Sequence, residues 1–197
     1  MSGALPNTSD FTAINVKSNQ QTQVSVSDSG KSFRRQVAGQ YWSFSLSFPE
    51  MTRTNFAPLQ AFMIKQRGAK ESFTVTFPSY MNAQGTASGS PTGTASAGAT
   101  SITLGGSGSG TLKAGDFIKF ANHNKVYMIV ADAGNIASSN TLTIEPPLQT
   151  AVSGIAITYD SVPFTVYAPN DVQQFRASNS SSGEPLFRYE IDVVEAI

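Results

Sequence analysis

The residue best suited to acid–base chemistry is the single histidine, His123, in a chain that has no cysteine. It lies in the segment Ala121-Asn122-His123-Asn124, which is typical of a turn. One imidazole could serve a catalytic triad, but no Gly-x-Ser-x-Gly nucleophile elbow accompanies it. A zinc site needs more nitrogen or sulfur ligands than this chain owns. We therefore interpret His123 as a plain turn residue.

Two glycine motifs could in principle hold a phosphate or a dinucleotide. Gly30-Lys31-Ser32 resembles the end of a P-loop, but the glycine required five residues earlier is replaced by Ser25. It is predicted to be a turn between two strands. The glycine-rich run at 105–110 is not followed by a helical pattern and misses the dinucleotide spacing, so we predict a hairpin loop there.

Carboxylates are sparse in the second half of the chain. A glycosidase needs two of them facing each other across a sugar, and a calcium loop needs an Asp-x-Asp-x-Asp pattern that is absent. Each carboxylate also suits a strand end or a turn, and a cryptic hydrolase is kept only as a third alternative. The candidates are Asp116, Asp132, Glu145 and Asp160. The sequence predicts no catalytic residues, no cofactor and no metal site, and hence no enzyme.

Aromatic and arginine side chains could form binding surfaces instead. Tyr41 and Trp42 stand beside many phenylalanines, but the alternation of these aromatics with serine predicts a core rather than an exposed platform. Four arginines are expected to be solvated or to make subunit contacts with Glu50 or Glu71. These are Arg34, Arg35, Arg53 and Arg67.

Composition narrows the class of protein. The chain has 197 residues, 40% of them hydrophobic, which is enough for one domain or two small ones with a packed interior. Only 13% are charged, about half the usual share, and this favours a surface that partners bury. Basic and acidic residues balance at 13 each, which argues against sequence-specific nucleic-acid binding or a polybasic membrane face. Without cysteine there are no disulfides, as suits assembly in a reducing cytoplasm.

Targeting and membrane segments are not expected. Residues 1–10 contain neither a basic region nor an apolar region, so they do not form a signal peptide. No apolar run approaches the length of about 18 residues that a membrane-spanning helix needs.

The elements that must position any site are mostly strands. Trp42, Phe44, Leu46 and Phe48 alternate with serines, which predicts a half-buried strand at 41–48. Similar alternation predicts strands at 73–77, 164–167 and 187–194, and Val24 and Val26 also alternate with polar residues. One helix is predicted at 55–67, where apolar residues recur at three- and four-residue spacing, Pro58 lies in the first turn and Gly68 follows the end.

The middle of the chain differs in character. Residues 81–100 are almost entirely small and polar, which predicts a flexible linker. Beyond it, short strands are predicted at 101–104, 116–120, 125–131, 141–144 and 155–159, as in a small barrel or sandwich. We expect a β-sandwich or barrel-like outer domain with one helix, made from residues 1–84 and 160–197. Residues 85–159 would form an inserted small β-barrel module.

This arrangement resembles the distal tail proteins of long-tailed bacteriophages. The resemblance rests on QYWSFSLSFP at 40–49, the helix that follows, GAKESFTV at 68–75 and the closing strand VVEAI at 193–197. The insert resembles a module of phage virion proteins through AGATSITL at 97–104, LKAGDFIKF at 112–120 and KVY at 125–127.

The resemblance implies a structural virion protein of the tail, assembled in the host cytoplasm. It implies a homohexameric ring, part of the baseplate or tail tip, between the tail tube protein and hub or fibre proteins. The module would project outward, where it could meet fibres or a host-surface glycan. Two alternatives stay open, a tail tube or other baseplate ring subunit and a carbohydrate-binding module.

Overall fold

Strands dominate the computed structural model, which describes residues 2–6, 11–37, 39–78, 80–137, 139–180 and 183–197. The prediction for residues 1–10 falls partly on residues 1 and 7–10, which lie outside this description. The described residues form fifteen strands and one helix, so the expected fold class, mainly β with one helix and a small barrel, is confirmed. None of these residues belongs to a helix long and apolar enough to cross a membrane.

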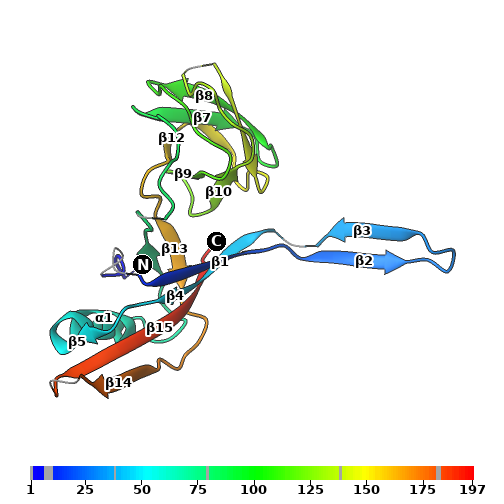
Figure 1. The fold of residues 1–197 in the computed structure, drawn as a ribbon. Coiled ribbons are helices and arrows are strands. Elements are labelled where there is room, and N and C mark those ends of the chain that lie inside the picture. The colour runs from blue at the N-terminus through cyan, green and yellow to red at the C-terminus, as the bar shows by residue number, and fades with distance from the viewer. Residues whose placement is uncertain (1, 7–10, 38, 79, 138, 181–182) are drawn as a thin grey trace.

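The larger sheet is built around β4 (Tyr41–Ser47), whose alternation places Trp42, Phe44 and Leu46 in the interior. β4 pairs with β1 (Ala13–Asn19) on one side and with β15 (Pro185–Glu195) on the other, both antiparallel. The order continues through β13 (Phe164–Tyr167) to β6 (Phe73–Val75), while β5 (Met51–Thr52) and β14 (Phe175–Asn179) also pair with β15. The chain therefore builds its main sheet from both of its ends, as Figure 1 shows.

One helix, α1 (Arg53–Lys65), packs against β15 and β5 of this sheet. Phe56, Leu59 and Met63 are buried along one side, and the Phe56 ring stacks on Phe187 with centroids 4.9 Å apart. The helix begins two residues earlier than predicted, so Pro58 lies in its second turn. It ends before Gly68, whose φ of +71° suits the change of chain direction.

A second apolar core lies inside a closed six-stranded barrel. Its strands are β7 (Pro91–Ala95), β8 (Ser101–Gly106), β9 (Phe117–Phe120), β10 (Val126–Ile129), β11 (Thr141–Glu145) and β12 (Val152–Thr158). In chain order they fall between β6 and β13 of the sheet, and Figure 1 shows the barrel standing beside that sheet.

Two predictions about this region were wrong. The predicted linker at 81–100 contains β7, because a closing barrel needs small residues where large ones crowd inward. A Cβ on Gly93 would lie 2.7 Å from the Phe120 ring and 2.9 Å from Ile102 Cγ2. The glycine-rich run at 105–110 is only partly a loop, since Gly105 and Gly106 extend β8 and Ser109 forms a bridge with Ser88.

A separate two-stranded hairpin is formed by β2 (Thr22–Val26) and β3 (Ser32–Gln36). It leaves the main sheet after β1 and returns into β4, and Figure 1 shows it extending away from the rest of the molecule. The Gly30 N–H donates to the Ser27 carbonyl and Gly30 has a φ of +79°, which confirms that Gly30-Lys31-Ser32 belongs to a turn. Val24 and Val26, which alternate as in a half-buried strand, are exposed.

Candidate functional site

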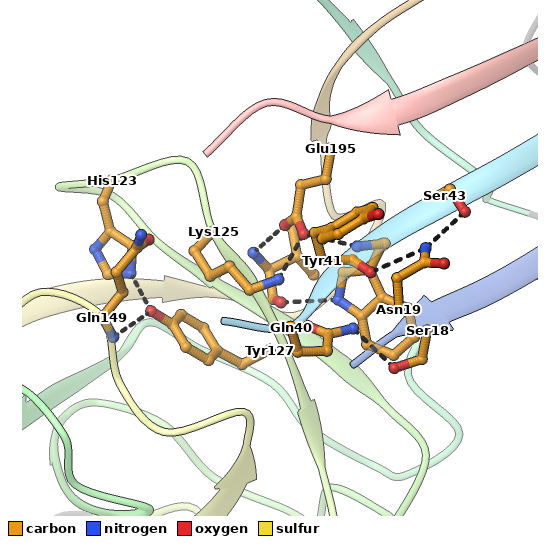
Figure 2. Close-up of polar contacts among 12 residues, drawn as sticks. Ser18, Asn19, Gln40, Tyr41, Ser43, His123, Lys125, Tyr127, Gln149 and Glu195 are labelled. Carbon is orange, nitrogen blue, oxygen red and sulfur yellow. Dashed lines mark hydrogen bonds and ion pairs between the residues drawn. The ribbon is translucent and has the colours of Figure 1, made fainter. Parts of the chain in front are cut away.

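Two almost completely buried charges of opposite sign lie where the barrel meets the sheet. Lys125, just before β10, and Glu195, at the end of β15, are almost completely buried and their Nζ and Oε2 atoms are 2.5 Å apart. Figure 2 shows the two side chains pointing toward each other. Burial lowers the pKa of Lys125, and the opposing attraction of Glu195 only partly offsets this.

The Glu195 carboxylate also accepts two backbone hydrogen bonds, one from each body. The Trp42 N–H donates to Oε2 at 3.0 Å, and the Val126 N–H donates to Oε1 at 2.8 Å. The Trp42 indole Nε1–H in turn donates to the Val126 carbonyl at 3.0 Å. One carboxylate and one indole therefore join β4 of the sheet to β10 of the barrel, and the arrangement fixes a geometry rather than performing a reaction.

Sequence reasoning missed this junction, although a signal for it existed. Tyr189, Ile191 and Val193 alternate inward along β15, and Glu195 occupies the next inward position. A carboxylate in a core register is almost never fully buried without a partner. Lys125 gave no comparable signal, because it stands at the start of a strand where charge is common.

His123 lies in the turn that the sequence predicted, but it is not isolated there. Its Nδ1 lies 2.7 Å from Asn122 Oδ1 and its Nε2 lies 2.8 Å from the Tyr127 hydroxyl. That hydroxyl also accepts the Gln149 N–H at 2.9 Å (Figure 2). Burial and nearby Lys119 lower the pKa of His123, and burial raises the pKa of Tyr127 to about 12. These contacts hold a turn against the barrel.

Two of the four carboxylates considered for hydrolysis, Asp116 and Asp132, have local structural contacts. Asp116 accepts the backbone N–H groups of Lys113 and Gln84 at 2.7 and 2.9 Å, which closes the turn before β9. Asp132 accepts from the Lys113 ammonium and from the Ala114 N–H, which hold the pKa of that carboxyl below its usual value. No three His, Asp or Glu side chains gather as a metal would require within the part of the chain that the structure describes.

Trp42 and most of the phenylalanines form a core, as predicted, whereas Tyr41 is partly buried and Phe33 and Phe175 are exposed. Trp42 is 5% exposed, and its ring meets Phe117 edge-on with centroids 5.2 Å apart. The arginines are dispersed, since Arg34 and Arg35 lie on the hairpin while Arg53 and Arg67 flank the two ends of α1. Glu50 forms an exposed ion pair with Arg188 at 3.0 Å, within the same chain.

The two outer edges of the main sheet differ. The N-terminal segment covers β6, because the N–H groups of Ser2 and Leu5 donate to the carbonyls of Ser72 and Thr74, each at 2.8 Å. β1 lies at the other edge, and among the described residues its only strand partner is β4. An uncovered edge strand offers backbone donors and acceptors to another chain.

Comparisons with known proteins agree with this architecture. The family model described as distal tail protein pb9, A domain, N-terminal, matches residues 6–80. The family model described as distal tail protein pb9, B domain, matches residues 80–157. A search of curated proteins found no match to the chain.

Proposed function

The chain belongs to the distal tail protein family of bacteriophages, and on that premise we propose that it forms a homohexameric ring between the tail tube and the hub or fibres of the tail tip. Membership of this family makes it a structural component of the virion tail. The position at the tail tip or baseplate, the number of subunits, the neighbouring proteins and assembly in the host cytoplasm are parts of the proposal.

The main observation that supports a ring is that one outer edge of the main sheet is covered and the other is not. The N-terminal segment closes the edge at β6, while no second strand of the described residues pairs with β1, on which Val16 is 42% exposed. A long open edge in a free protein invites aggregation, whereas a closed ring pairs each edge with a neighbour. The low content of charged residues, 13%, also favours a surface that subunits cover.

We propose that the chain divides its work between two domains. Residues 1–84 and 160–197 form the ring, and residues 85–159 form the module that projects from it. Two apolar clusters support this division, one inside the barrel and one under the sheet, which Phe117 and Val126 of the barrel also join. The Lys125–Glu195 junction would keep every module at the same angle around the ring, and the protein would have no catalytic activity of its own.

No specific observation favours glycan binding by the barrel. A glycan site usually offers exposed aromatic rings, but Phe117, Phe120 and Tyr127 are buried and Tyr159 is only partly exposed. The alternative of a tail tube subunit predicts that the chain is present along the whole tail, because tube subunits repeat along its length.

Immunogold labelling of intact virions tests the proposal. Antibodies raised against this chain should label the distal end of the tail, at one position. Label spread along the tail would identify a tube subunit instead, and tails without label would contradict a virion role. Negative-stain imaging of the material released from labelled tail tips should then show hollow sixfold rings.

A further inference from the structure

Among the described residues, the two strands of the β2–β3 hairpin pair only with each other. All ten residues of these two strands are exposed. An isolated two-stranded hairpin is marginally stable in water. Its apolar side chains, with Val24 57%, Phe33 55% and Val37 60% exposed, indicate that another surface covers it.

Both faces of the hairpin carry the same mixture of apolar and basic groups. Val24 pairs with Arg34, so these two side chains share one face, whereas Phe33 and Arg35 pair with Ser25 and Gln23 on the other. Lys31 lies over the Phe33 ring, with its Nζ 5.5 Å from the ring centroid. No ion pair between described residues involves Arg34 or Arg35. The hairpin arm therefore carries three basic residues, Lys31, Arg34 and Arg35, against one acidic residue, Asp28, in its turn.

A polar groove on the main sheet has the complementary chemistry. It has a volume of about 290 Å³ and lies over β4 and β15, where Asn15, Ser45, Gln173 and Gln174 contribute to its lining. Of the described residues that line it, the charged ones are Glu190 and Asp192, and both are exposed. Ser45 Oγ donates to Asp192 Oδ1 at 2.6 Å, while no ion pair between described residues engages either carboxylate.

The hairpin of one chain cannot reach its own groove. It continues from the end of the β1–β4 pair marked by Asn19 and Tyr41, whereas the groove lies toward the opposite end, where Ala13 pairs with Ser47. In Figure 1 the hairpin points away from β14 and β15. At about 3.4 Å per residue, the arm reaches roughly 30 Å beyond the sheet, which is enough to meet an adjacent molecule.

We propose that the β2–β3 hairpin of one copy docks in the Glu190–Asp192 groove of a second copy of this chain. Arg34 would face the two carboxylates, and Val24 and Val26, which share its face of the hairpin, would lose their contact with water. Because arm and groove are different surfaces, the contact runs head to tail, and repetition closes a ring. This inference rests on the proposed ring and assigns two of its contact surfaces.

Cysteine cross-linking tests the contact cleanly, because the chain has no cysteine of its own. Ser32→Cys places a thiol on the arm and Ser47→Cys places one in the groove, and both changes leave the charged residues of the two surfaces intact. The two chains are mixed at high concentration and oxidised. We expect a covalent dimer, formed at least about tenfold faster than in a control in which Ser153→Cys, on exposed β12, replaces the groove variant.

A chain carrying both Ser32→Cys and Ser47→Cys should give a ladder that stops at a closed ring. The two thiols lie on the order of 40 Å apart along the strands of one chain, so a disulfide within the chain cannot form. Cross-linking at the control rate would overturn the docking proposal. Distal immunogold label with sixfold rings would still support the ring in that case, so the two failures are distinguishable.

Charge reversal then tests the pairing itself. Arg34→Glu in the arm chain should lower the cross-linking rate about tenfold, and Glu190→Arg with Asp192→Arg in the groove chain should restore it. Raising the salt concentration from about 50 mM to about 500 mM should weaken the wild-type contact, because exposed charges are screened. Unrestored rates in the doubly reversed pair would overturn the assignment of the groove.

Discussion

At the scale of single residues, His123 shows how a turn histidine can be tied to a protonation state. The Gln149 N–H donates to the Tyr127 hydroxyl, which leaves the hydrogen of that hydroxyl free to be donated to His123 Nε2 at 2.8 Å. The neutral ring with its hydrogen on Nδ1, donated to Asn122, satisfies both contacts. A proton on Nε2 would leave the Tyr127 hydrogen without an acceptor, so this contact favours the neutral ring. Burial acts in the same direction, because it lowers the pKa of His123.

Acidification should therefore destabilise the fold through His123. Its pKa is lower in the folded chain than the ordinary value of 6.5, so below about pH 6.5 the unfolded chain binds more protons than the folded one. Stability should fall as the pH drops from 7 through this window toward the folded pKa. Thermal unfolding from pH 7.5 to 5 should show the decline in the wild type and a flatter curve in His123→Gln, with the variant already less stable at pH 7.5. Equal slopes for the two proteins would contradict the assignment.

The Lys125–Glu195 pair should be costly to break on one side only. Lys125→Met leaves the Glu195 carboxylate buried with two backbone donors but no cation, and we expect a loss of about 3–5 kcal/mol in the free energy of unfolding. Adding Glu195→Gln removes the charge yet keeps an oxygen for the Val126 N–H, so the double variant should recover part of that loss. Urea denaturation measures Lys125→Met, Glu195→Gln alone and the double variant against the wild type. Additive losses within about 0.5 kcal/mol would show that the two side chains are not coupled.

At the scale of elements, period-two alternation was a reliable guide wherever an apolar face packs within the same chain. It predicted β4 and β15, because every second side chain of those strands is buried. It could not predict β7, whose inward residues are as small as Gly93, nor that β2 would stand free of the core. Alternation indicates that one face of a strand is apolar and will be buried. Which surface buries it depends on the whole fold or on a second chain.

The barrel should be sensitive to a single added methyl group at Gly93. A Cβ there would lie within 3 Å of Phe120 and Ile102, both almost fully buried, so Gly93→Ala should cost about 1–3 kcal/mol of unfolding free energy. Gly134→Ala is the matched control, because a Cβ at that exposed position meets nothing within 4 Å. Chemical denaturation followed by circular dichroism compares the two. If both variants have the unfolding free energy of the wild type, the barrel interior can accommodate the added methyl group and the predicted steric cost is wrong.

At the scale of the whole molecule, stability and assembly should depend on different parts of the chain. The two cores hold the sheet and the barrel, whereas the hairpin buries almost nothing against either. The fold can therefore lose the arm without losing its interior. The arm matters only if its exposed valines, Phe33 and arginines meet another copy.

Replacing residues 20–40 by Asn-Gly tests this separation directly. Asn19 and Tyr41 are paired antiparallel, and a two-residue Asn-Gly turn suits the connection of two such strands. The shortened chain should keep a cooperative thermal transition and the circular dichroism of a β protein, because the residues removed are mostly exposed. It should nevertheless fail to assemble.

Incorporation into virions measures that failure. Host cells expressing an epitope-tagged chain are infected, and the purified virions are probed for the tag. The tagged full-length chain should enter tails, while the tagged shortened chain should be depleted at least about tenfold, the loss expected when a contact worth about 1.4 kcal/mol disappears. Equal incorporation would show that the arm is dispensable for assembly. Loss of the cooperative transition would instead show that the arm belongs to the folding unit, contrary to its exposure.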